Sequence, residues 1–295
     1  MSFRSALIVT IGLLVVGSTR AEEGAAPAPT DVQIFSLGSL KLIAMRDGRF
    51  VAPNNAQTFG VDAGAPAVAA VLAKAGASTD RITVSVNVLA VVTPRQIILL
   101  DTGLGPKAGG VLQASLAKAG IAANSVTDVL ITHTHGDHIG GLLAATGGSA
   151  FPKAVIRVSA KEWASAKSQP AMSSLVKVIG PQVKTFEPGT RVLPVVTPVA
   201  IDGHTPGHVG YEIASGGVKL LDIGDTALSS IISLAKPDWT MGFDGDAILA
   251  KASRRATLTR LAKSHELVFA PHFPFPGVGR IEKDGDGFVW KAALK

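Results

Sequence analysis

The chain has 295 residues, of which 47% are hydrophobic and 17% are charged, and this composition excludes an intrinsically disordered protein. It contains no cysteine, which excludes a disulfide scaffold, a thiolate zinc site and a cysteine nucleophile. The formal net charge is +6, but the densest basic run, Arg254-Arg255 with Arg260 and Lys263, fits a solvated helix face better than a phosphate-binding stripe. A nucleic-acid partner is therefore not expected.

Residues 1–21 have the pattern of a secretory signal peptide. Arg4 gives a positive start, and the apolar run from Ala6 to Val16 is too short to span a bilayer. An uncleaved membrane anchor is the alternative. We expect residues 22–31 to form a flexible tether rich in Ala, Pro and Gly, and residues 32–295 to form one domain. The mature protein is then expected to be periplasmic or secreted, with no membrane association after processing.

Strand and helix patterns follow one another in chain order after the tether. The first is a strand at 40–46 with a turn at Asp47-Gly48, and a polar loop from 48 to 64 is expected to overhang a site. The most apolar stretch, Ile82 to Leu100, is interrupted by Asn87, Pro94 and Arg95, so strands are expected there and not a membrane span. Further strands are predicted at 82–90, 97–100, 126–132 and 154–159, and helices at 66–75, 111–119 and 139–145. This alternation indicates a layered α/β fold.

The last third of the chain adds two hairpins, a helix and a strand. The hairpins are expected at 209–223 and 279–291, and a strand at 266–270. The clearest helix is 247–263, which Asp246 is placed to cap. We find no internal repeat and no interior linker, so the sequence predicts a single domain.

Most of the seven histidines lie in three short segments next to apolar strand patterns. The first, from His133 to His138, has four metal-ligand residue types directly after a buried strand. His133 and His135, two residues apart in non-helical chain, can point to the same side, whereas the adjacent Asp137 and His138 cannot easily serve that same ion. This geometry suggests two metal ions.

The other segments supply further candidate ligands. In Gly203-His204-Thr205-Pro206-Gly207-His208, the Pro and Gly residues predict a tight loop. We expect His208 to be the ligand there and His204 to order the loop, while His265 is expected at the surface. Asp225 and His272 each follow buried strand residues, and strand ends at one rim of a sheet are where α/β proteins assemble their sites.

This pattern resembles the metallo-β-lactamase superfamily, whose HxHxDH signature is present as His133-Thr-His135-Gly-Asp137-His138. The resemblance spans roughly residues 37 to 290 and implies an α/β fold, the four-layer αββα sandwich. It further implies that one zinc ion is bound by His133, His135 and His208, a second by Asp137, His138 and His272, and that Asp225 bridges the two. Asp101 resembles the Asp-x-Gly element of the family, which implies that it holds a ligand histidine. A simple turn-forming aspartate is the alternative for Asp101.

The implied ligand set predicts a hydrolase. Two zinc ions would share a hydroxide nucleophile and polarise the bond under attack, and Asp137 and Asp225 would accept protons. Bridging Asp225 counts against a true β-lactamase, because members of that branch generally lack it. The segment from Pro271 to Arg280 resembles the group that holds methyl parathion hydrolase and the N-acyl-homoserine lactonases.

The substrate is expected to be a small molecule: a lactone, an ester or a phosphotriester. Leu228 stands where the lactonases often carry a tyrosine that assists ring opening. Expected walls of a substrate pocket are Phe50, Trp163, Leu228 and Phe273. The alternatives are a β-lactamase-type amide hydrolase and a non-catalytic metal-binding protein of the same fold. A homodimer is compatible with the sequence.

Overall fold

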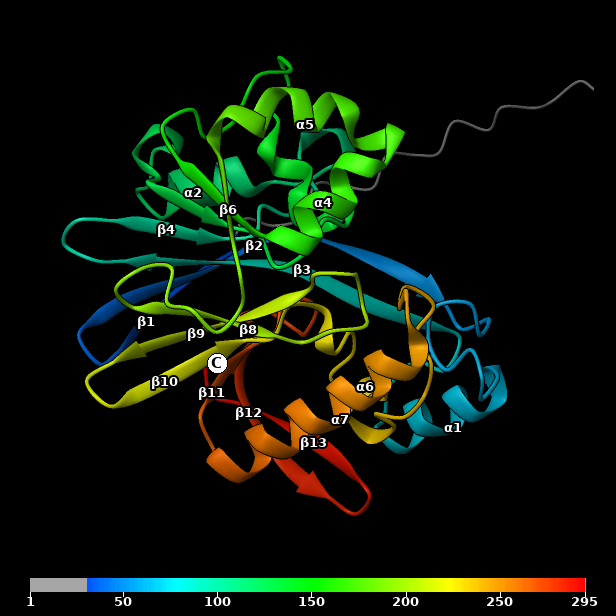
Figure 1. Cartoon of the computed structure of the whole chain (residues 1–295). Coiled ribbons are helices and arrows are strands. Elements are labelled where there is room, and N and C mark those ends of the chain that lie inside the picture. Colours follow the sequence, from blue (N-terminus) through cyan, green and yellow to red (C-terminus); the bar gives the residue numbers. More distant parts are fainter. Residues whose placement is uncertain (1–30, 295) are drawn as a thin grey trace, which may run out of the picture.

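The computed structural model describes residues 31–294, so the predicted signal peptide and residues 22–30 of the expected tether lie outside the described residues. Two β-sheets pack face to face, and helices cover the outer face of each (Figure 1). The predicted α/β class and the four-layer αββα sandwich are therefore confirmed. Between residues 31 and 294, no helix is both long enough and apolar enough to cross a membrane.

The first sheet has its strands in chain order. Neighbours from β1 to β4 are antiparallel, and neighbours from β4 to β7 are parallel. The strands are β1 (Val32–Leu37), β2 (Leu40–Pro53), β3 (Arg81–Val92), β4 (Ile97–Leu100), β5 (Asp128–Leu130), β6 (Val155–Ser159) and β7 (Val183–Phe186). Parallel strands need crossover connections, and these crossovers place α2, α4 and α5 on the outer face (Figure 1).

The second sheet has the spatial order β13-β12-β11-β10-β9-β8. Its strands are β8 (Val196–Ala200), β9 (Val209–Ser215), β10 (Val218–Asp222), β11 (Leu267–Phe269), β12 (Val278–Asp284) and β13 (Gly287–Ala292). β10 and β11 are parallel, and α7 forms the crossover between them. The other neighbours are antiparallel.

The helices lie in two layers on opposite sides of the paired sheets (Figure 1). They are α1 (Ala65–Lys74), α2 (Leu112–Lys118), α3 (Gly136–Ile139), α4 (Ala160–Ser168), α5 (Ser173–Ile179), α6 (Ile232–Ala235) and α7 (Ala247–Ser264). Asp246 caps α7 as predicted, because its side chain accepts a hydrogen bond from the Leu249 N–H at 3.0 Å.

Separate apolar cores fill the layers. Leu42, Leu130 and Tyr211 belong to the core between the two sheets. Leu112 and Leu175 pack in the core between the first sheet and its helices, and the core beneath α7 lies on the other side. Burial of this apolar surface is the main force that holds the layers together.

The predicted turn at Asp47-Gly48 and the start of the predicted 48–64 loop are wrong. β2 continues to Pro53 through a β-bulge between Arg46 and Gly48. The buried Asp47 carboxylate accepts hydrogen bonds from the N–H groups of Leu104 and Leu112, each at 2.7 Å. A residue type that favours turns is thus used at a bulge, where it holds two other segments in place.

The predicted helix at 139–145 is also wrong. α3 ends at Ile139, and a 3₁₀ turn over 140–142 follows it. At this point the chain packs backbone against backbone: a Cβ atom on Gly140 would lie 2.0 Å from the Leu104 carbonyl oxygen. The glycines permit this close approach and lower the tendency to continue a helix.

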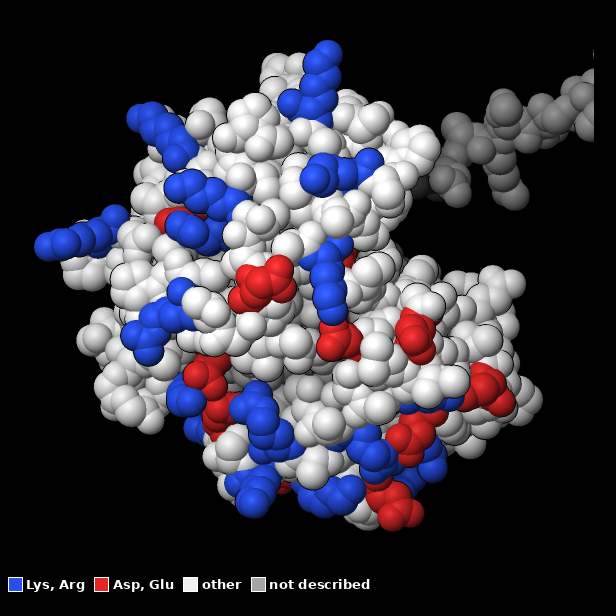
Figure 2. Space-filling model, in the orientation of Figure 1, with Lys and Arg blue, Asp and Glu red and all other residues white. Residues whose placement is uncertain are grey.

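Charged side chains are spread over the face shown in Figure 2, and in its lower half Lys and Arg are interspersed with Asp and Glu. Arg255 pairs with Asp238 and Arg260 with Glu266 on the exposed side of α7. The expected solvated face of α7 is therefore observed for these two residues. Arg254 departs from it, because its side chain is fully buried.

Candidate metal centre

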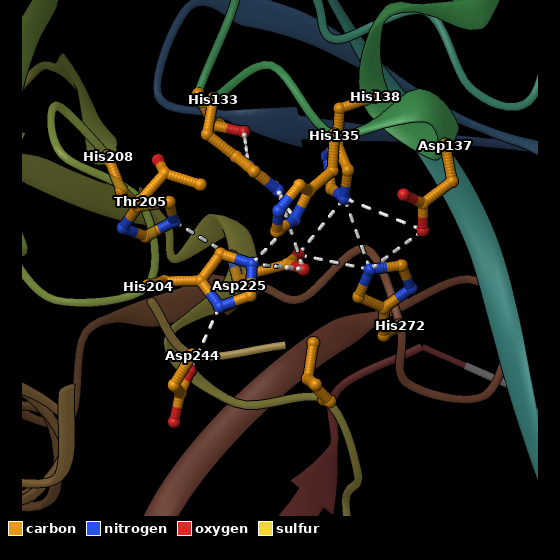
Figure 3. Close-up of polar contacts among 12 residues, drawn as sticks. His133, His135, Asp137, His138, His204, Thr205, His208, Asp225, Asp244 and His272 are labelled. Carbon is orange, nitrogen blue, oxygen red and sulfur yellow. Dashed lines mark hydrogen bonds and ion pairs between the residues drawn. The ribbon is translucent and has the colours of Figure 1, made fainter. Parts of the chain in front are cut away.

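The candidate ligands lie at one edge of the sandwich, where strands of both sheets end (Figure 3). His133 and His135 follow β5; Asp137 and His138 belong to α3; His204 and His208 lie in the loop between β8 and β9; Asp225 follows β10; and His272 follows β11. Residues far apart in the sequence thus meet because the two sheets pack with their strand ends together.

The described residues contain two groups with the spacing of metal sites. The first group is His133, His135, His204 and Asp225, and the second is Asp137, His138 and His272. Within each group, one ligand atom per residue lies within 4.8 Å of all the others. The structure thus brings six of the seven ligands expected from the sequence into these groups, together with His204, and the seventh, His208, accepts the N–H of Asp225.

Asp225 lies between the two groups. Its Oδ2 atom is 3.1 Å from Nε2 of His204, and its Oδ1 atom is 3.0 Å from Nε2 of both His138 and His272. Each carboxylate oxygen therefore faces a different group. This is the arrangement that a bridging carboxylate requires.

In the structure His204, and not His208, belongs to the first group, whereas the sequence resemblance implies His208 as the ligand of this loop. His208 uses both ring nitrogens elsewhere: Nδ1 donates to the Ile201 carbonyl at 2.8 Å, and Nε2 accepts the N–H of Asp225 at 2.9 Å. His204 turns its Nε2 toward Asp225 and toward Nδ1 of His135, which is 3.0 Å away. Both rings thus lie beside Asp225, and both are candidate ligands of this loop (Figure 3).

Outer partners fix which nitrogen of each histidine faces the centre. Nδ1 of His272 donates to the Ser85 carbonyl oxygen at 2.8 Å, and this leaves a lone pair on Nε2. Nδ1 of His138 lies 2.8 Å from Oδ2 of Asp101, with the same consequence. The two Nε2 atoms then face each other at 3.2 Å. Lone pairs this close need a proton or a cation between them.

Asp225 gives a second indication that the residues fit metal ions. Its Oδ1 atom is buried and has no hydrogen-bond partner in the described part of the chain, although nitrogens of His138 and His272 surround it. Imidazole nitrogens together with carboxylate oxygens suit zinc and several other divalent cations. The donor set therefore fits two divalent cations that share Asp225.

Burial and neighbouring charges shift the pKa values of the residues around Asp225. Burial disfavours a charged His204, but the carboxylates of Asp225 and Asp244 outweigh it and raise the pKa of His204 to about 9. Burial also opposes the ionised form of Asp225, yet His272 and His138 hold its pKa well below the ordinary range. Burial and the neighbouring His204 lower the pKa of His208 to about 4, which keeps it neutral and able to accept the Asp225 N–H.

Asp101 directly follows β4 and lies beside a histidine of the second group. It adopts φ = 58°, a left-handed conformation that is costly for a residue other than glycine. In this conformation its carboxylate accepts hydrogen bonds from the N–H and Oγ1 of Thr132, at 2.8 and 2.7 Å, and also reaches His138. Asp101 thus positions a histidine of the second group.

A cavity of about 380 Å³ opens onto the two groups. Its lining consists of Phe50, Thr58, Phe59, Val84, Leu104, His135, Gly136, Asp137, Asp225, Leu228, Phe243 and His272. Two of the four expected wall residues, Phe50 and Leu228, are among them. Part of the predicted 48–64 loop, Thr58 and Phe59, also overhangs the site.

The other two expected wall residues, Trp163 and Phe273, lie elsewhere. Trp163 packs from α4 against the core on the outer face of the first sheet. Phe273 is fully buried in the core beneath α7, where its ring meets Trp290 with centroids 4.9 Å apart. Both are therefore core residues, which is the more frequent role of a large aromatic side chain.

Arg254 supports the site from behind. Its guanidinium contacts the Asp244 carboxylate at 2.6 Å and donates to the carbonyl oxygens of Thr226 and Pro237. Asp244 in turn lies 2.9 Å from Nδ1 of His204. The sequence analysis did not predict this series of contacts from Arg254 through Asp244 to His204, because a charged residue on an amphipathic helix is usually solvated.

Asn87 is a second supporting residue. It interrupts the apolar pattern of β3, and its Nδ2 donates to the carbonyl oxygens of Pro271 and Phe273 at 2.9 and 2.8 Å. These bonds hold the turn that carries His272. The polar residue within an apolar strand was the signal that could have found it.

Comparison with known families and structures agrees with this geometry. The model of the Metallo-beta-lactamase superfamily matches residues 81–272. Over 105 residues, the chain is 32% identical to a hydroxyacylglutathione hydrolase of Pseudomonas entomophila (strain L48); the match covers 35% of this chain and 34% of that protein. The chain spans about a fifth to a third of the length of the curated relatives it matches.

Two solved structures are similar over nearly the whole described chain. AidC, a dizinc quorum-quenching lactonase in complex with a product, has a TM-score of 0.85 and 29% identity, with 90% of this chain and 98% of that chain covered. The hydrolase AbOPH has a TM-score of 0.82 and 25% identity, with 91% and 99% covered. Each likeness extends across both sheets and the strand ends that form the candidate centre.

Proposed function

The chain belongs to the metallo-β-lactamase superfamily, and on that premise we propose that it is an exported binuclear zinc hydrolase that opens lactones or cleaves neutral esters or phosphotriesters. One observation carries the proposal. Asp225 presents one oxygen to each of two histidine-rich groups, and both groups lie at the base of an apolar cavity.

The lining of the cavity favours a neutral substrate with an apolar substituent. Phe50, Phe59, Leu228 and Phe243 form much of its wall, and within residues 31–294 no Lys or Arg is part of it. A basic residue would be expected in a pocket built to hold a carboxylate or a phosphate monoester. This argues against a glutathione thioester, which carries carboxylates, and for a lactone, ester or phosphotriester. The lactonase AidC and the hydrolase AbOPH support the same assignment.

Different residues of the site bind the cations and transfer the proton. When two divalent cations are bound here, they supply Lewis acidity toward the carbonyl or phosphoryl oxygen and lower the pKa of water. The histidines and Asp225 hold them in place. Asp137 borders the cavity with a side chain that is 23% exposed, 3.5 Å from Nε2 of His272. Its carboxylate can take a proton from the attacking water and deliver it to the leaving group.

Asp225 is the weaker candidate for that proton transfer. It is buried among histidines, and its pKa is held well below the ordinary range by His272 and His138, against the effect of burial. A carboxylate with so low a pKa is a poor base. Its part is to join the two groups, and Asp137 is the proton carrier.

The test of the proposed function uses the purified full chain after reconstitution with excess zinc. Elemental analysis should find two zinc ions per chain, and turnover should be highest on an acyl-homoserine lactone, an aryl ester or methyl paraoxon. One metal or none would contradict the binuclear site. Nitrocefin as the best substrate would contradict the assignment and favour a β-lactamase.

Export rests on residues 1–21 alone and has its own test. Expression of the full-length chain in a Gram-negative host should give a periplasmic or secreted product whose intact mass corresponds to a start near Glu22. A soluble cytoplasmic pool that retains residues 1–21 would refute this part of the proposal and leave the hydrolase assignment intact.

A further inference from the structure

Glu162, in the first turn of α4, is a buried carboxylate with a full set of hydrogen bonds from two loops. Its Oε1 atom accepts from the N–H and from Oγ1 of Thr134, at 2.8 and 2.7 Å. Its Oε2 atom accepts from Oγ1 of Thr205 and from the N–H of Gly207, at 2.8 and 2.9 Å. These four bonds use the acceptor capacity of one carboxylate, and the side chain is 1% exposed.

The loop between β8 and β9 also docks directly on the start of α4. Oγ of Ser159 donates to the Gly207 carbonyl oxygen at 2.6 Å, and it caps the helix by accepting the Glu162 N–H. A Cβ atom on Gly207 would lie 2.3 Å from the Glu162 nitrogen. The loop therefore meets the helix at a distance that only glycine permits.

The positions of the donors give Glu162 its significance. Thr134 stands between His133 and His135, and Thr205 directly follows His204. The Glu162 carboxylate thus accepts hydrogen bonds from both loops that contribute histidines to the His133 group, the loop after β5 and the loop between β8 and β9. The second group depends on other supports: Ser85 holds His272, and Asp101 holds His138.

We propose that Glu162 is a positioning residue, which sets the separation of the two histidine loops and thereby tightens cation binding at the site that Asp225 shares with His133, His135 and the 204–208 loop. The inference rests on the proposed binuclear site. Some residues hydrogen-bond to metal ligands without binding the metal themselves. Mutation of such a residue commonly reduces metal affinity by about 10-fold to 100-fold. Glu162 acts one step further out, through the loops themselves.

The experiment measures zinc affinity and does not depend on turnover. Metal-free protein is titrated with zinc in competition with a chromophoric chelator, and two dissociation constants are fitted. Glu162→Gln should weaken one of them at least about 10-fold, because its amide NH₂ group would face the N–H of Gly207, donor against donor. Exposed Glu187→Gln is the matched control and should change neither constant.

Two further variants identify the affected site. Thr205→Val removes one hydroxyl donor and keeps the side-chain shape, so it should weaken the same constant by a smaller factor. His133→Ala removes a candidate ligand of that group, so adding Glu162→Gln to it should leave the remaining constant unchanged. The melting temperature of each metal-free variant reports separately on the fold.

The outcomes separate the inference from the proposed function. A wild-type chain that binds no zinc would overturn both. A wild-type chain that binds two zinc ions, with Glu162→Gln and Thr205→Val weakening both constants equally or neither, would overturn the inference alone. Selective weakening of one constant by both variants supports it.

Discussion

The backbone N–H of Asp225 donates a hydrogen bond to Nε2 of His208 at 2.9 Å, so a buried histidine fixes the residue that joins the two ligand groups. The ring is held from its other side by the carbonyl of Ile201. Gly224 makes this approach feasible, because a Cβ atom there would lie 2.5 Å from the same nitrogen. The loop therefore brings two histidines to Asp225, His208 at its N–H and His204 at its carboxylate.

The two histidines of this loop should behave differently when mutated. His204→Ala removes a candidate ligand and should weaken binding of one zinc ion by about 10-fold or more. His208→Ala keeps the residues of both groups but leaves the Asp225 N–H without its acceptor, so it should lower the free energy of unfolding by about 1 to 3 kcal/mol. Equilibrium dialysis against zinc and urea unfolding measure the two effects. Greater metal loss in His208→Ala than in His204→Ala would identify His208 as the ligand of this loop.

Asp225→Asn should reduce turnover about 100-fold or more, because a neutral amide cannot join two cations as a carboxylate does. Asp222→Asn is the matched control. Burial raises the pKa of Asp222 well above the ordinary range, its Oδ1 accepts the Gly224 N–H, and its Oδ2 has no hydrogen-bond partner among the described residues. The amide of asparagine can therefore replace the Asp222 carboxyl group with little loss of stability or activity. Equal loss of activity in the two variants would contradict the role given to Asp225.

Phe243 should affect substrate preference and leave stability unchanged. Its ring lines the cavity and is 50% exposed, so substrate can cover what solvent now reaches. Phe243→Ala should raise KM for a long-chain acyl lactone by about 3-fold to 10-fold through lost apolar contact, with kcat and melting temperature nearly unchanged. Leu249→Ala removes a comparably exposed side chain outside the cavity and serves as control. An equal KM for both variants and wild type would exclude Phe243 from substrate binding.

Asp62 should make the segment beside the cavity sensitive to acid. Although partial burial opposes it, hydrogen bonds from the N–H and Oγ1 of Thr240 lower the pKa of Asp62. A carboxyl with a lowered folded-state pKa stabilises the fold above about pH 4, and this contribution is lost as the pH falls through that pKa.

Asp62→Asn should therefore cost up to about 1 kcal/mol at pH 7, since the pair with Lys251 is partly exposed and screened. The difference from wild type should shrink as the pH is lowered from 7 to 3. Urea unfolding at the two pH values measures it. A difference that grows in acid would contradict the assignment.

The ligand segment from His133 to His138 was predictable because its chemistry is local: four ligand types follow one buried strand. The position of the His204 ring beside Asp225 was not. It depends on where the two rings of the 204–208 loop find partners, and those partners, Asp244 and the Ile201 carbonyl, become neighbours only in the folded chain.

The supporting residues show a second limit. Glu162 and Arg254 are charged residues on helices, and a sequence pattern places such residues in solvent. Each is instead buried because the fold brings several polar groups to it at once. Most sheet strands followed from apolar runs, but β1, β7 and β8 were not predicted. The short helices α3 to α6 were not predicted correctly either, since backbone contacts between distant glycines and caps decide their ends.

The outer wall of the cavity is built from a pairing that involves none of the candidate ligands. Phe59 and Met241 form an isolated β-bridge, and the Gly242 N–H donates to the Thr58 carbonyl at 2.9 Å. The backbone of this wall is thus held without the candidate ligands, whereas the rings of Phe50 and Phe243 meet those of His272 and His135. A saturation library at Phe59 therefore offers a route to new substrate ranges by directed evolution, because this side chain lies on a different part of the scaffold from the strand ends that hold the metal ligands.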